Sequence, residues 1–214
     1  MSRGSLTYPV LASGTWTIGL EAVSNPFFRV DAWLTSWLVG SASPTFVTGK
    51  TESRLIGSPG TAHGVVSVAS YTTKRTWTDI NGSSRSYFSA VMNQIANYAS
   101  SGPSRDGATL PHIAAPGYGV AGSLSSQALS SISSTYRLAD GVHFISSGTS
   151  VAAAHVAGGV ALLLQSIPDL TRDQIVNQLT NSATTDGFTG AVPNSRWGAG
   201  KLYLQSSPRG SDST

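Results

Sequence analysis

A run of small and apolar residues near the end of the chain restricts the fold more than any other feature. Residues 148–165 are Gly, Thr, Ser, Val, Ala and Leu, with His155 and a final Gln as the only larger polar side chains. Because such a run has no polar face, it predicts a buried central helix. The apolar stretch at residues 151–164 is too short to span a bilayer, so we expect no membrane partner.

Shorter patterns surround this helix. Residues 64–69 and 112–115 are apolar runs that suit strands of a sheet covered on both faces. The polar, Ser-rich residues 72–94 predict a loop or insertion. The capping box Thr171-Arg172-Asp173-Gln174 predicts a second helix that continues through Leu179. Alternating strands and helices predict an α/β fold class.

The N-terminal part has a different pattern. Residues 15–20 and 28–34 alternate apolar and polar side chains, which predicts short strands. Two or three such strands cannot form a stable sandwich alone. We therefore expect a partial β-rich segment at residues 1–55, an α/β part at residues 56–205 and a disordered tail at residues 206–214.

Composition excludes several kinds of partner. Charged residues make up 11% of the chain and the net charge is +3, with no run of basic residues, so we expect no nucleic-acid partner. The chain has no cysteine, which rules out disulfides and thiolate sites. No loop rich in Asp or Asn has the spacing of calcium ligands, so we predict no metal or other cofactor in this chain.

The motif Gly148-Thr149-Ser150 opens the predicted buried helix. A serine in the first turn of a helix has a backbone N–H without an intrahelical acceptor, directed to where an oxyanion would form. Serine is also a favoured helix cap. From position alone, a nucleophile and a simple capping residue both stay open for Ser150.

Residues 148–158 closely resemble the nucleophile segment of subtilisin-like serine proteases, the subtilases. Three further segments resemble the same family in the family's order: residues 95–107, Ala115-Pro116-Gly117 and residues 197–202. In the N-terminal part, Gly14-Thr15-Trp16-Thr17 and Asp31-Ala32-Trp33 look like the end of the jelly-roll insertion that some subtilases carry.

This resemblance implies a fold and a set of roles. It implies the C-terminal portion of a subtilisin-like parallel sheet with helices on both faces, preceded at residues 1–55 by a few strands of a jelly-roll-like insertion. It assigns Ser150 as the nucleophile, with its N–H as an oxyanion donor, and Gly148 and Thr149 as substrate-binding residues. His155 maps to a structural histidine of the motif.

Three positions depart from the family pattern. Val151 replaces the usual Met and Ala154 the usual Pro, both with small or apolar side chains. His112 stands where the family usually has an acidic residue, and the sequence offers no functional account of it.

The other triad members are missing. A subtilase needs an Asp and a His upstream of the nucleophile, and neither Asp-Thr-Gly, Asp-Ser-Gly nor His-Gly-Thr-His occurs here. Asp31 and His63 stand in the right order, but the insertion and a varied position before a strand explain them better. His143 is near Ser150 in sequence, in a region that is a strand or loop in the family. We therefore expect the triad Asp and His upstream, and this chain alone to be inactive.

Two functions follow from these patterns. The first is a serine endopeptidase that hydrolyses peptide bonds through an acyl-enzyme on Ser150, with a polypeptide substrate and the N-terminal part of the same protease as partners. The alternative is a non-catalytic pseudoprotease or regulatory binding module of the same fold. A hydrolase of another fold would have both glycines of Gly-x-Ser-x-Gly, and Ser150 has only the first. The chain leaves its localisation open, and the family resemblance implies an extracellular or cell-envelope protein.

Overall fold

The computed structural model describes residues 14–21, 23, 30–34 and 45–204. The chain divides into two compact units, Met1–Lys50 and Thr51–Thr214. The predicted boundary between residues 55 and 56 stays a prediction, and the tail predicted at residues 206–214 lies outside the described residues.

The first unit has no strand or helix among its described residues. The strand predicted at residues 15–20 is therefore absent, and the one predicted at residues 28–34 falls partly outside the described residues. Trp16, Ile18 and Leu20, the apolar side of the first pattern, are each more than 60% exposed. An alternating pattern forms a strand only where a sheet neighbour and a core cover one face. The jelly-roll assignment of this unit stays a prediction.

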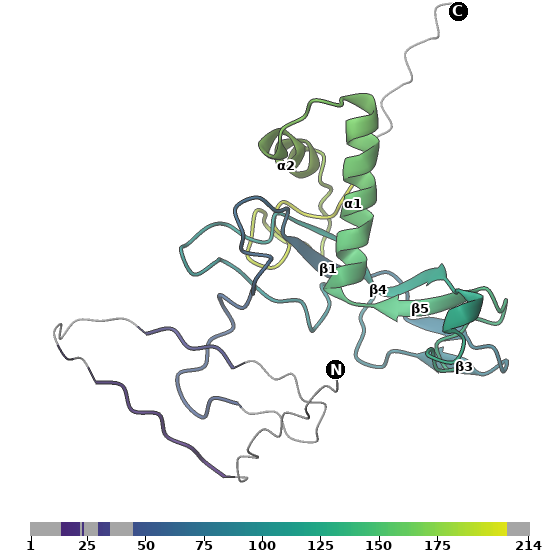
Figure 1. Ribbon diagram of the computed structural model, residues 1–214, viewed down its shortest axis with the longest axis horizontal. Coiled ribbons are helices and arrows are strands. Elements are labelled where there is room, and N and C mark those ends of the chain that lie inside the picture. Colours follow the sequence, from purple (N-terminus) through teal and green to yellow (C-terminus); the bar gives the residue numbers. More distant parts are fainter. Residues whose placement is uncertain (1–13, 22, 24–29, 35–44, 205–214) are drawn as a thin grey trace, which may run out of the picture. The chain divides into compact units, whose positions relative to one another are not determined.

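The second unit is built on a mixed three-stranded sheet (Figure 1). The sheet has the order β1 (Val68–Thr72), β4 (Ile113–Ser123), β5 (His143–Ser147). Strand β1 pairs with β4 in parallel, and β4 pairs with β5 antiparallel. Both predicted strands exist, but β1 begins four residues later than residue 64, and β4 is much longer than residues 112–115.

Two helices follow the sheet in sequence. Helix α1 (Thr149–Ser166) matches the predicted central helix, and α2 (Arg172–Asn181) matches the predicted second helix. The capping box is present in full: the Thr171 hydroxyl accepts from the Gln174 N–H, and the Gln174 side chain accepts from the Thr171 N–H. The α/β fold class is confirmed.

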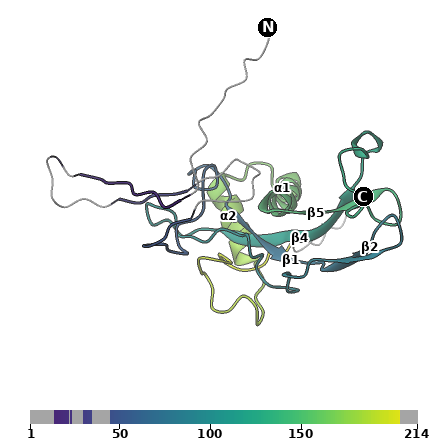
Figure 2. The same ribbon diagram turned by 90° about the horizontal axis from the view of Figure 1, so that it is seen from below.

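The main core lies between one face of the sheet and both helices. It contains side chains from β4, α1 and α2, which are Ile113, Ala115, Ala152, Val156, Ile175 and Leu179. The opposite face of β4 packs against an irregular segment, because the buried Ala114 contacts Trp197. Figure 2 shows α1 on one side of the sheet and this C-terminal segment, in yellow, on the other.

Helix α1 is less buried than the sequence predicts. Only Ala152, Val156 and Gly159 are buried, while the opposite face is exposed and consists of small or apolar residues: Ala153, Ala154, Ala157, Gly158, Ala161 and Leu162. The expectation of a helix buried all round is therefore wrong for this chain.

By length and composition alone, α1 is also the one helix of the described residues that could cross a membrane. The prediction that residues 151–164 are too short to span a bilayer was thus wrong, because the helix extends beyond them to 18 residues. The core helix of a soluble protein meets the same criteria, and α1 packs on the sheet through Ala152 and Val156. The absence of a membrane partner stays a prediction.

Residues 72–94, predicted as a loop or insertion, contain a hairpin. Strands β2 (Thr76–Thr78) and β3 (Ser84–Ser86) pair antiparallel. The fully buried Asp79 organises the turn, since its carboxylate accepts from the N–H groups of Asn81 and Ser83 and from Arg85 Nε at 2.7 Å. Burial raises the pKa of Asp79, but these hydrogen bonds and the Arg85 charge outweigh it and hold the pKa below its usual value. The loop prediction was wrong because the hairpin depends on one buried carboxylate, which a count of polar residues does not reveal.

Candidate active site around Ser150

Ser150 is placed by a direct passage from strand to helix. Strand β5 ends at Ser147, the single residue Gly148 follows, and α1 begins at Thr149. Gly148 has φ 152° and ψ 156°, a backbone region that only glycine adopts readily. The glycine before Thr149 and Ser150 thus has a steric reason, since the chain must turn from strand into helix within one residue.

The hydrogen bonds around Gly148 leave the next two N–H groups without acceptors. The Gly148 N–H donates to the Gly117 carbonyl at 2.8 Å, and the Gly148 carbonyl accepts from Val151 and Ala152. No acceptor within the described residues is recorded for the N–H of Thr149 or Ser150, and both residues are exposed. The first turn of α1 therefore presents a hydroxyl and free N–H groups together, as an oxyanion site requires.

Gly117 holds the sheet close to this turn. A Cβ at this position would lie 2.4 Å from Ser70 Oγ, 2.8 Å from the Gly148 carbonyl oxygen and 2.9 Å from Ala152 Cβ. Real Cβ atoms do not come so close to other atoms. The glycine of Ala115-Pro116-Gly117 therefore lets β4 touch the start of α1.

Side chains hold the end of β5 as well. The Ser147 hydroxyl accepts from the Gly119 N–H at 3.1 Å and donates to the Tyr87 hydroxyl at 3.0 Å. The rings of Tyr87 and Tyr98 pack on Tyr118 with centroids 4.7 and 5.1 Å apart. An aromatic cluster of Tyr87, Tyr98 and Tyr118, which the sequence patterns did not identify, thus supports the end of the strand that leads to Ser150.

His143 does not reach this site. It begins β5, four residues from Ser147, and an extended strand of that length measures about 13 Å. Its Nδ1 lies 2.8 Å from Asp140 Oδ2, so the ring already has an acidic partner.

No hydrogen bond to Ser150 is found within the described residues for His63, the other candidate base, or for His155, which the resemblance assigns a structural role. His63 is exposed on a turn before β1, where its charge helps to lower the pKa of Asp106 after the larger effect of Ser104. His155 is exposed, with its Nδ1 3.0 Å from the Val151 carbonyl. Asp31 belongs to the first unit, so its earlier assignment to the insertion stays a prediction. Within the described residues of the second unit, no hydrogen bond joins Ser150 to His63 or His143, the histidines considered as its base.

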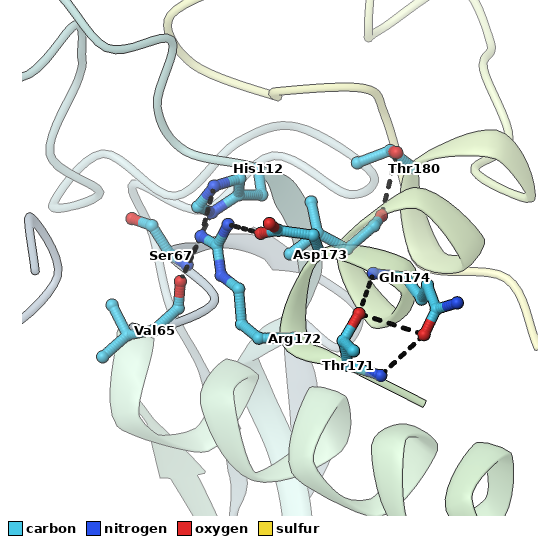
Figure 3. A network of polar contacts seen from close by, with 9 residues as sticks. Val65, Ser67, His112, Thr171, Arg172, Asp173, Gln174 and Thr180 are labelled. Atoms are coloured by element: carbon cyan, nitrogen blue, oxygen red, sulfur yellow. Dashed lines mark hydrogen bonds and ion pairs between the residues drawn. The ribbon is translucent and has the colours of Figure 1, made fainter. Parts of the chain in front are cut away.

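His112 acquires a structural role (Figure 3). Its Nδ1 accepts from the Ser67 N–H at 2.8 Å, and its Nε2 lies 3.1 Å from Arg172 Nη2. Arg172 also donates to the Val65 carbonyl at 2.7 Å. His112 and Arg172 thus join the segment before β1, the start of β4 and the start of α2. Burial, and then the Arg172 charge, lower the pKa of His112.

No group of three or more His, Asp or Glu side chains that could hold a metal ion occurs among the residues that the structure describes. The expectation that this chain holds no calcium stays a prediction.

Comparison with known proteins identifies relatives of this site. The family model Peptidase_S8, the subtilase family, matches residues 36–200. The chain is 31% identical over 160 residues to serine protease AprX of Bacillus subtilis, covering 74% of this chain and 33% of AprX. It is 29% identical to Bacillopeptidase F of the same organism over 221 residues, covering 92% of this chain and 14% of that protein.

Two other relatives differ in coverage. An uncharacterized protein of Aquifex aeolicus is 31% identical over 181 residues, covering 81% of this chain and 77% of that protein. The solved CspB protease of Clostridium perfringens has the same fold, with a TM-score of 0.53 and 24% identity over 73% of this chain and 29% of that one. The chain thus spans about a third of the length of AprX. The family model covers most of the chain, including the strands and helix that place Ser150, and the chain belongs to the subtilase family of serine proteases.

Proposed function

We propose that this chain supplies the nucleophile of a subtilisin-type serine endopeptidase. Ser150 Oγ attacks the carbonyl carbon of a peptide bond while a histidine takes the hydroxyl proton. The C–N bond then breaks, the histidine passes the proton to the leaving amine, and water hydrolyses the resulting acyl-enzyme. The Ser150 N–H donates to the oxyanion, and Gly148 and Thr149 contact the substrate.

The observation that carries this proposal is the first turn of α1. Ser150 is exposed, its N–H has no recorded acceptor in the described part of the chain, and the positive end of a helix of 18 residues lies behind it. A serine that only capped a helix would accept a hydrogen bond from a helical N–H, yet the cap position belongs to Gly148.

The base must come from another segment. Ser150 has no histidine partner within the described residues, and a serine hydroxyl without a base is a weak nucleophile. We assign the histidine and its aspartate to the N-terminal part of the same protease. The exposed small and apolar face of α1 supports such a partner, because a face of this composition is stabilised when other protein covers it.

A serine-directed fluorophosphonate tests the proposal. The label is read by intact mass on the chain alone and on the chain mixed with the upstream segment of its gene. We expect labelling only in the mixture, at Ser150. The Ser150→Ala variant should lose the label, while Ser166→Ala, at the far end of the same helix, should keep it.

The other outcomes lead to different conclusions. Labelling of the isolated chain would place the base inside it and contradict the assignment of the histidine. No labelling in either sample would contradict the endopeptidase and favour the pseudoprotease or binding module.

A further inference from the structure

The carbonyl of Gly117, on β4, anchors the turn at Gly148 that leads to Ser150. It accepts two hydrogen bonds, one from the Gly148 N–H at 2.8 Å and one from the Tyr98 hydroxyl at 2.9 Å. Gly148 is the residue on which the direction of α1 depends, because it is the sole link between β5 and the helix. Any movement of the Gly117 carbonyl is therefore transmitted to Ser150 through one residue.

Tyr98 is held in turn by a buried serine. Ser70, on β1, is fully buried, and its Oγ lies 3.2 Å from the Tyr98 hydroxyl oxygen. Since the single phenolic proton goes to Gly117, the Ser70 hydroxyl donates to Tyr98. The three groups form a chain of hydrogen bonds from β1 through Tyr98 to β4, and bonds in such a chain strengthen one another.

The phenol remains a donor under ordinary conditions. Burial raises the pKa of Tyr98 above its usual value, against smaller opposite effects of Ser70 and of the Gly148 backbone. Tyr98 also keeps 41% of its surface exposed, so the ring packs on Tyr118 without being part of a closed core.

We propose that Tyr98 is a positioning residue of the active site, whose hydroxyl orients the Gly117 carbonyl and thereby the Gly148–Ser150 turn. The inference rests on the proposed function, because it assigns Tyr98 to the same nucleophile. It predicts that the hydroxyl acts on the rate of acylation and not on substrate affinity, since the hydroxyl is bonded to backbone and to Ser70.

Tyr98→Phe tests this role, since it removes the hydroxyl and keeps the ring. In the mixture that labels at Ser150, we expect kcat and the fluorophosphonate rate to fall about three- to tenfold, as for the loss of one neutral hydrogen bond, with KM within about twofold. Tyr136→Phe is the matched control, because Tyr136 packs on Tyr87 and its hydroxyl makes no hydrogen bond within the part of the chain that the structure describes. An unchanged kcat in Tyr98→Phe, or an equal fall in the control, would overturn the inference.

Ser70→Ala supplies a second test of the relay. If Ser70 acts through Tyr98, the double variant Ser70→Ala/Tyr98→Phe should be no slower than Tyr98→Phe alone. Additive losses would show that the two hydroxyls act separately and would contradict the relay.

Amide hydrogen exchange tests the positioning role of Tyr98 without measuring enzyme activity. In the 214-residue chain, Tyr98→Phe should increase exchange of the Gly148 N–H about three- to tenfold relative to Tyr136→Phe, because the acceptor of that N–H is less firmly held. Unchanged exchange would count against the inference even if the chain were a pseudoprotease. If wild type is not labelled in the mixture, but the Gly148 N–H exchanges faster in Tyr98→Phe, the endopeptidase proposal is refuted. The role of Tyr98 in positioning the Gly148–Ser150 turn then still holds.

Discussion

Replacing Gly117 by alanine should damage the active site more than it damages the fold. The new methyl group would meet three neighbours at 2.4–2.9 Å, namely Ser70 Oγ, the Gly148 carbonyl oxygen and Ala152 Cβ. The Ser70 hydroxyl can rotate away, but Gly148 and Ala152 contribute backbone and a Cβ that move only with the first turn of α1. Favourable contacts between carbon atoms begin at about 3.5 Å, so α1 must withdraw by roughly half an ångström or more.

This overlap sets the expected loss of stability and of labelling rate. Forcing an extra methyl group into a packed site costs about 1–3 kcal/mol, which should lower the urea midpoint of the chain without changing the slope. Displacement of a reacting group by about 1 Å reduces rates about 100-fold, so the labelling rate at Ser150 should fall by about one to two orders of magnitude.

Gly122→Ala is the matched control on the same strand. A Cβ there would meet only Phe144 Cε1 at 3.7 Å, an ordinary contact, so stability and labelling should stay close to wild type. Two results would refute the reasoning: labelling of Gly117→Ala within twofold of wild type, or equal losses in the two variants.

Two further predictions concern stability. As pH falls below about 6.5, the unfolded chain takes up a proton that folded His112 resists, because burial and Arg172 lower its pKa, so the free energy of unfolding should decrease from that pH downwards. Urea midpoints at pH 7.5 and 5.5 should converge in His112→Asn and stay apart in His63→Asn, and equal pH dependence in both variants would count against this account. Gly158→Ala, on the exposed face of α1 with no atom within 4 Å of the new Cβ, should stabilise the isolated chain by about 0.5–1 kcal/mol. A lower urea midpoint would mean that this face is not open in the chain alone.

Local signals in the sequence were sufficient for the helices. The run of small residues predicts α1, and the capping box at Thr171 predicts α2, since in each case residues within a few positions supply the relevant interactions. The motif at Ser150 and its small-residue helix likewise identify the family. What the motif could not predict is the exposure of one α1 face, which depends on which other segments pack on the helix.

Features that depend on distant residues escaped prediction. His112 takes its environment from Ser67 and Arg172, which are 45 and 60 residues away in sequence. Tyr98 gains its place from bonds to Ser70 and Gly117, on two different strands. The strand pattern at residues 15–20 failed for the opposite reason, because alternation describes a face that can be buried but not the sheet that would bury it.

The antiparallel pairing of β4 and β5 has a consequence for the position of Ser150. Tyr118 pairs with Ser147 and Val120 with Ser146, so β4 contains one extra residue, a bulge at Gly119, immediately beside the end of β5. Because α1 starts only one residue after β5, a slip of this pairing by two residues would carry Ser150 about 7 Å along the sheet, and a slip by one would turn the end of β5 to the other face. The bulge therefore fixes the register of β5 against β4, and with it the position of the Ser150 hydroxyl.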